Sequence, residues 1–140
     1  MQSGVSFARI DPDGEDRFQR LRGELGVESF GLNLIRLRPG QRGRIHRHRR
    51  QEEVYVVLAG RLTLVLQDEQ HELGPHELAR VAPDVRRQLV NRGDQPLLLL
   101  ALGGAEPHEG RDGLAYASWE DTEGRPPAQV PLPEDVPRSG

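Results

Sequence analysis

The sequence predicts an all-β fold with a single core, and three observations support this. Glycine and proline are frequent, at 16 and 11 of 140 residues, and they separate short apolar segments. Two of those segments, 54–59 and 97–102, are apolar on both strand faces, so both of their faces must be covered. The length suits one hydrophobic core and is too short for two. We therefore expect many short strands in a sandwich or barrel.

Each expected strand is a short alternating or apolar segment that ends at turn residues. Segments 6–9 and 17–23 stand on either side of the turn DPDGED, and 29–38 ends at a Pro-Gly pair. Segment 44–49 precedes a charged turn, and a single glycine separates 53–59 from 61–67. The last strands, 70–73, 77–82, 86–91 and 96–102, alternate with turns that contain Asp, Gly or Pro.

The composition changes after residue 104. We expect a domain over 1–104 that includes the N-terminal strands, followed by an acidic, Pro-rich C-terminal extension over 105–140. Residues 1–102 hold 16 arginines and 14 acids, whereas 103–140 hold 3 arginines and 8 acids, and five prolines lie in 126–137. We expect this segment to be extended, or disordered at its end. Its apolar stretch 114–119, which contains the only tryptophan, is the part that could dock.

Composition also limits the function. No apolar run approaches the roughly 20 residues that cross a bilayer, and the N-terminus lacks a secretory signal, so we expect a cytoplasmic protein without membrane contact. The net charge of -3 argues against nucleic-acid binding. Because there is no cysteine, disulfides, thiolate nucleophiles and cysteine metal sites are excluded. A metal would have to be held by histidine and carboxylate.

The candidate chemistry lies in residues 40–60, GQRGRIHRHRRQEEVYVVLAG. On a strand, His46 and His48 share one face about 7 Å apart, and Glu53 opens the next strand. Two histidines and one carboxylate on neighbouring strands can form a facial triad that leaves coordination positions open. Taken alone, the decapeptide RGRIHRHRRQ favours a solvated basic run in which the two histidines occur by chance.

The spacing of Gly40, His46, His48, Glu53 and Gly60 resembles the first motif of the cupin superfamily at every fixed position. The resemblance extends over residues 29–102 and implies a double-stranded β-helix, also called a jelly-roll barrel. It does not specify a reaction, because this superfamily includes enzymes, sugar-binding regulators and storage proteins.

The second motif of that superfamily implies a fourth ligand, a histidine, at a position where this chain has Arg87 when Asn91 is aligned. A guanidinium has no lone pair and cannot ligate a metal. Three alternatives follow: Arg87 turns aside or anchors an anionic substrate above the metal, pairs with Glu53 in place of the ion, or is solvated on the outer face. His76 is the remaining histidine to check as a fourth ligand.

Further pocket residues are expected from strand alternation. Arg44 precedes His46 by two and Tyr55 follows Glu53 by two, so we expect both to bind substrate, although Tyr55 also fits a core aromatic. Asn33 is a weaker candidate. The expected function is that of an enzyme using divalent Fe, Mn, Ni, Co, Cu or Zn on a small molecule. The alternative is a metal-free binding protein in which Arg87 and Arg44 hold an acidic ligand.

We also expect a homodimer. Unpaired sheet edges invite association, and the apolar stretch 114–119 would then contribute to the interface or cover the barrel.

Overall fold

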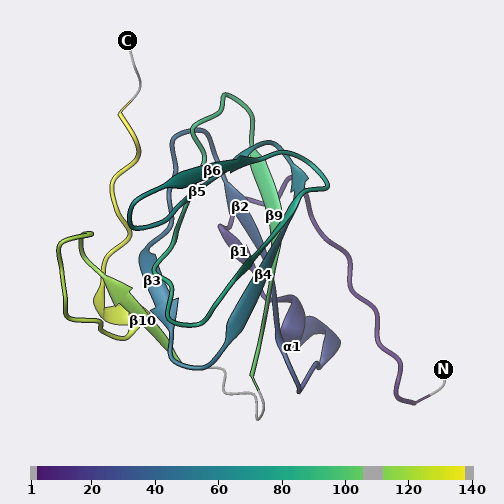
Figure 1. Cartoon of the computed structure of the whole chain (residues 1–140). Helices are drawn as coiled ribbons and strands as arrows, with labels where there is room; N and C mark the ends of the chain where they lie inside the picture. Colours follow the sequence, from purple (N-terminus) through teal and green to yellow (C-terminus); the bar gives the residue numbers. More distant parts are fainter. Residues whose placement is uncertain (1–2, 106–111, 138–140) are drawn as a thin grey trace.

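The alternating apolar residues build two layers of strands that face each other across one core (Figure 1). The structure is a computed structural model and describes residues 3–105 and 112–137. The first layer is a five-stranded antiparallel sheet. Its order is β1 (Phe18–Gln19), β2 (Gly31–Leu37), β9 (Leu97–Gly104), β4 (Glu52–Ala59) and β7 (Leu78–Val81).

The second layer consists of two smaller sheets. One has the order β6 (Gln70–Leu73), β5 (Leu62–Val65), β8 (Gln88–Val90), and the other pairs β10 (Gly113–Tyr116) with β3 (Ile45–His48). Isolated bridges join them at Arg42–Val90 and His46–Arg87. The all-β jelly-roll prediction is therefore confirmed, although in the described residues the sheets are not hydrogen-bonded into a closed barrel.

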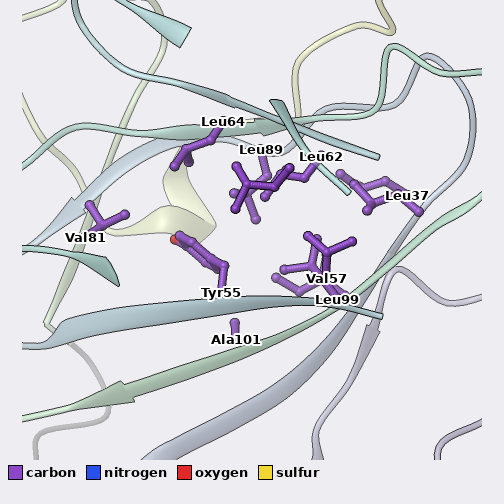
Figure 2. Close-up of a cluster of buried hydrophobic side chains, with 12 residues drawn as sticks. Leu37, Tyr55, Val57, Leu62, Leu64, Val81, Leu89, Leu99 and Ala101 are labelled. Atoms are coloured by element: carbon purple, nitrogen blue, oxygen red, sulfur yellow. The ribbon is translucent and has the colours of Figure 1, made fainter. Parts of the chain in front are cut away.

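The core lies between the two layers. Figure 2 shows Tyr55, Val57 and Leu99 of the first layer facing Leu62 and Leu89 of the second. Val57, Leu62 and Leu99 have no exposed surface, and burying each such side chain stabilises the fold by about 1.5–3 kcal/mol. On β9 the side chains alternate between buried and half-buried, so its outer face is covered only in part.

Two glycines of the 40–60 motif are needed for their backbone conformation. Gly40 and Gly60 have φ values of 87° and 80°, in the left-handed region. A Cβ atom on Gly60 would lie 2.4 Å from the carbonyl oxygen of Pro96. This glycine therefore allows the close approach of the turn between β4 and β5 to the start of β9.

The N-terminal prediction was wrong in two places. Residues 6–9 form no strand and are exposed, because their alternating residues find no partner strand. In 17–23 only β1 is a strand, and it is followed by a short helix α1 (Leu21–Leu25). Leu21 is buried, and Gly26, with φ 74°, ends the helix in the left-handed conformation.

The C-terminal extension packs against the second layer, as Figure 1 shows for its yellow-green and yellow segments. Strand β10 pairs with β3, and the 3-10 helix η1 (Pro127–Gln129) precedes the buried Val130. The sequence did not predict β10 as a strand, although it singled out the stretch 114–119, which overlaps it. The described part of the chain has no helix with the length and hydropathy that a membrane crossing requires.

Candidate metal centre

Strand β3 presents both predicted histidines on its inner face. The ring centroids of His46 and His48 lie 5.3 Å apart, at an interplanar angle of 89°. Arg47 lies on the opposite face, where its Nε donates to the Tyr116 hydroxyl of β10 at 2.8 Å. The alternation predicted for this strand is therefore present.

Glu53, near the start of β4, brings its carboxylate to the two histidines. Its Oε1 lies 3.3 Å from His46 Nε2 and 3.1 Å from His48 Nε2, and the three ligand atoms lie within 4.8 Å of one another. With metal–ligand distances of about 2.1 Å, neighbouring ligand atoms are separated by roughly 3 to 3.4 Å. The separations from Glu53 therefore fit a first-row transition metal held by three protein ligands.

The other nitrogen of each imidazole has an acceptor of its own. His46 Nδ1 lies 3.2 Å from the carbonyl oxygen of Arg44, and His48 Nδ1 lies 2.7 Å from Asp112 Oδ1. A carbonyl and a carboxylate only accept, so both Nδ1 atoms carry hydrogen. In neutral rings each Nε2 then has a lone pair directed at Glu53, and such a contact requires a shared proton or a cation.

Asp112 is a site residue that the sequence analysis missed. Its side chain is 2% exposed, Oδ2 accepts from the backbone N–H groups of Arg50 and Gln51, and Oδ1 also accepts from Gln51 Nε2. Carboxylates that hold the second nitrogen of a histidine are typical of metal sites. No sequence signal indicated it, because it is 64 positions from His48 in an acidic segment.

Arg87 lies at the level of His46, to which it is bridged in antiparallel register. Its side chain has no exposed surface, so the solvated alternative was wrong. The Nη2 donates to Glu53 Oε1 at 2.6 Å, and Nε donates to the Tyr55 hydroxyl at 3.3 Å. The Nη1 donates to the carbonyl oxygens of Ala82, Pro83 and Val85. The guanidinium therefore has protein acceptors on all three nitrogens.

Tyr55, which is 1% exposed, is a second hydrogen-bond donor to Glu53 beside Arg87. Its hydroxyl donates to Glu53 Oε1 at 2.7 Å. Burial and the nearby carboxylate raise the pKa of Tyr55 well above its usual range, so the phenol keeps its proton. Tyr55 is thus both a core aromatic and a hydrogen-bond donor at the site.

Hydrogen bonds within the site shift the pKa values of Glu53 and His48 in opposite directions, and both shifts favour the charged forms. Burial would raise the pKa of Glu53, but the hydrogen bonds from His46 and His48 hold it well below its ordinary value. Burial would lower the pKa of His48, but its hydrogen bonds to Glu53 and Asp112 outweigh burial and raise it. Without a metal, the site therefore favours an imidazolium beside a carboxylate.

Two cavities meet at His48 and Glu53, and His46 lines the smaller of them. Both are lined by Asn33, His48, Glu53 and Ala101; one has a volume of about 300 Å³ and the other about 620 Å³. The smaller cavity is also lined by Arg44 and Tyr55. Arg44, Tyr55 and Asn33 thus line a cavity at the candidate site. Their role in substrate binding stays a prediction. His76 lies in an exposed turn, outside the ligand cluster.

A family model described as Cupin domain matches residues 33–103, which is half of the chain. The chain belongs to the cupin family. Protein SchB of Streptomyces halstedii is 32% identical over 131 residues, covering 90% of this cupin and 93% of that protein.

Solved structures are similar as well. A sugar phosphate isomerase of the cupin superfamily from Silicibacter pomeroyi has a TM-score of 0.61 and 30% identity, covering 83% of this cupin and 79% of that chain. A cupin protein from Bacteroides fragilis has a TM-score of 0.65 and covers 74% and 86% of the two chains. Its 22% identity bears on the fold alone.

Proposed function

We propose that this cupin binds a divalent transition metal through His46, His48 and Glu53 and uses it in a reaction on a small molecule. The observation that supports this most is the meeting of two Nε2 lone pairs and one carboxylate oxygen, with both Nδ1 atoms already hydrogen-bonded. Fe, Mn, Ni, Co, Cu and Zn all suit such a donor set.

When bound, the metal supplies a Lewis acid or an oxygen-activating centre with open coordination positions. The surrounding residues set the charge of the site. Arg87 already neutralises Glu53, and the remaining ligands are uncharged imidazoles. A dication added there keeps an excess of positive charge, which attracts anionic molecules. Tyr55 and Arg87 hold the carboxylate in place by donating to the same oxygen.

The relative from Silicibacter pomeroyi, described as a sugar phosphate isomerase, makes phosphorylated sugars the first substrates to test. At 30% identity it suggests a class of molecule for assay rather than a particular substrate.

A metal-free binding protein is the second candidate, and one contact favours it. The buried ion pair between Arg87 and Glu53, at 2.6 Å, occupies the oxygen that a metal would use. In that case Arg87 and a protonated His48 lie against the Glu53 carboxylate, and Arg44, which lines the same cavity, would hold an acidic ligand without a metal.

Metal analysis separates the two candidates. The protein is purified without a His-tag or chelator, and we expect about one equivalent of metal per chain in the parent. His46→Ala and His48→Ala should each lose it while keeping the parent's circular dichroism spectrum. His71→Ala, which removes an imidazole that is 55% exposed, is the matched control and should retain the metal. A parent that remains metal-free after incubation with each of the six metals would favour the binding protein.

A further inference from the structure

We propose that Arg17 and Arg44 form the anion-binding end of the smaller cavity, so that the ligand is a small molecule with one phosphate or carboxylate group. The proposal deepens the proposed function and rests on it, because the same cavity contains His46, His48 and Glu53.

The two arginines reach the cavity from different parts of the fold. Arg17 directly precedes β1, and Arg44 directly precedes β3. Each is anchored by one hydrogen bond to the backbone: Arg17 Nη1 donates to the Arg42 carbonyl oxygen at 2.9 Å, and Arg44 Nε donates to the Val130 carbonyl oxygen at 2.7 Å. A guanidinium has five N–H groups, so most of them remain for another acceptor.

Within residues 3–105 and 112–137, neither arginine forms an ion pair. Burial lowers the pKa of Arg17, Asp135 partly offsets this through longer-range attraction, and Arg44 lowers it further. Arg17 and Arg44 therefore line one half-buried cavity and repel each other, while Asp135 offsets only part of the cost of burying Arg17. Bringing an anion between them would relieve this repulsion.

Other arginines of the chain donate more hydrogen bonds within the fold than Arg17 and Arg44 do. Arg36 donates from all three of its nitrogens, to the carbonyl oxygens of Asp11 and Asp16 and to Gln19 Oε1. Arg87 likewise has acceptors for all three nitrogens. Their guanidinium groups are used within the fold, whereas Arg17 and Arg44 line the cavity and, within the described residues, each guanidinium donates one hydrogen bond.

The remaining walls indicate the shape of the ligand. Ile35, Leu37 and Leu89 line the same cavity, and their side chains offer no hydrogen bond. Planar guanidinium groups suit the oxygens of phosphate and carboxylate. The volume of about 300 Å³ is at the lower end of the range for small-molecule sites. A compact molecule with one anionic group and an uncharged body fits these features.

Calorimetric titration of the intact chain tests the proposal with glycerol 3-phosphate, glycerate and glycerol as probes. We expect one of the two anions to bind and glycerol not to bind, and the anion that binds identifies phosphate or carboxylate. Arg17→Gln and Arg44→Gln should each weaken its binding by roughly tenfold or more, as expected for a hydrogen bond to a charged group. Arg44→Lys, which keeps the charge, should recover part of the loss.

Arg38→Gln is the matched control, because Arg38 is an exposed arginine that lines neither cavity. It should bind the anion as the parent does. Thermal melting checks that each variant is folded. Equal binding by the parent, Arg17→Gln and Arg44→Gln, or binding of neither anion, would overturn the proposal.

Metal content, measured on the same samples, keeps this outcome separate from the proposed function. Neither arginine side chain belongs to the ligand cluster, and the Arg44 carbonyl that meets His46 is unaffected by the substitution. Full metal content without arginine-dependent anion binding overturns the subsite alone. Arginine-dependent binding in a chain that takes up no metal supports the subsite and contradicts the metal-dependent function. The titration is repeated after metal removal, so that anion binding to the metal itself is recognised.

Discussion

Glu53 Oε1 is the atom on which the candidate site depends. Arg87, Tyr55, His48 and His46 all approach it, at 2.6, 2.7, 3.1 and 3.3 Å. A single oxygen with this many neighbours is well positioned and strongly stabilised as an anion. Changing any one neighbour therefore alters both the stability of the fold and the affinity for a metal.

Arg87→His restores the fourth imidazole that the second motif implies. We expect tighter metal binding, because a cation leaves the site and a lone pair enters it. We also expect the metal-free variant to lose about 3 kcal/mol of unfolding free energy, because a buried ion pair is broken and backbone carbonyls lose their donor. Urea unfolding with and without Zn²⁺ measures both effects.

Arg80→His is the control for that experiment. Arg80 pairs with Glu52 at the same 2.6 Å, but both side chains are more than half exposed. Its loss should cost less than about 1 kcal/mol. An Arg87→His variant with unchanged or weaker zinc affinity would show that the new imidazole does not reach the metal.

Asp112→Asn tests whether Asp112 positions His48. We expect metal affinity to fall by about 10- to 100-fold, as for other carboxylates that orient a ligating histidine. The ¹⁵N chemical shifts of the His48 ring should move toward a mixture of tautomers, which a purely structural role would not produce. Asp121→Asn, at a partly exposed Asp outside the site that also accepts backbone hydrogen bonds, should change neither measurement.

The pH dependence of the metal-free protein follows from His48 and Glu53. The pKa of His48 is raised above 6.5, so its contribution to stability is present below pH 6.5 and is lost as the pH rises through the folded value. The pKa of Glu53 is lowered from 4.5, so its contribution is present above pH 4.5 and is lost in more acidic solution. We expect these groups to stabilise the fold most between pH 4.5 and 6.5.

Thermal melts from pH 4 to 9 measure this dependence, and His48→Gln should remove the decline on the alkaline side. Metal affinity should follow the opposite trend and increase with pH, because the proton on His48 competes with the metal. Metal affinity that stays constant between pH 5.5 and 8.5 would contradict a role for His48 as ligand.

The cluster of His46, His48 and Glu53 could be predicted from the sequence because the three residues are close along the chain and their spacing matches strand alternation and the first cupin motif. Arg87 could be aligned only because Asn91 fixes the register, and its protein acceptors could not be foreseen. Asp112 could not be found, since its contact with His48 depends on the return of the C-terminal extension.

At the level of elements, strand β10 is the part of the C-terminal extension that pairs with the second layer. It pairs with β3 on the strand that carries both histidines, so that Gly113 lies opposite His48 and Ala115 opposite His46. The stretch was singled out because its apolar residues contrast with the acidic segment around it. Its strand partner could not be identified, because pairing over more than 60 residues leaves no local signal.

At the N-terminus the error is a predicted strand where the structure has a helix. Residues 17–23 alternate in part and therefore suggested a long strand, but the burial of Leu21 against the fold and the left-handed Gly26 favour a helical turn. The glycine was a helix-ending signal that could have been used. The expected strands in 29–104 were confirmed, with their ends displaced by a few residues.

Truncation after Gly104 tests the role of the extension. We expect a lower melting temperature, because Ala115, Tyr116 and Val130 leave the buried surface, at a cost of about 3 kcal/mol or more. We also expect loss of metal retention, because His48 loses Asp112. Unchanged melting and metal content in the truncated chain would show that the extension is passive.

At the scale of the whole molecule, the homodimer stays a prediction. The five-stranded sheet ends at β1 and β7, and Leu78 on β7 is 61% exposed. Edges of this kind are available for pairing with a second chain. Light scattering over a range of protein concentrations should give twice the mass of the 15.7 kDa chain, and a monomeric mass throughout would contradict the prediction.

The C-terminal extension folds back on the second layer, and this affects the order in which parts of the site form during synthesis. The backbone N–H of Val136 donates to the carbonyl oxygen of Gly40, and Arg42 Nε donates to that of Glu134, 92 residues later. A ribosome synthesises the two layers before it reaches these partners. Strands β2 to β9 also precede Asp112, so the nascent chain can bring His46, His48 and Glu53 together while His48 still lacks the Asp112 carboxylate. The hydrogen bond that orients His48 is then one of the last contacts of the candidate site to form.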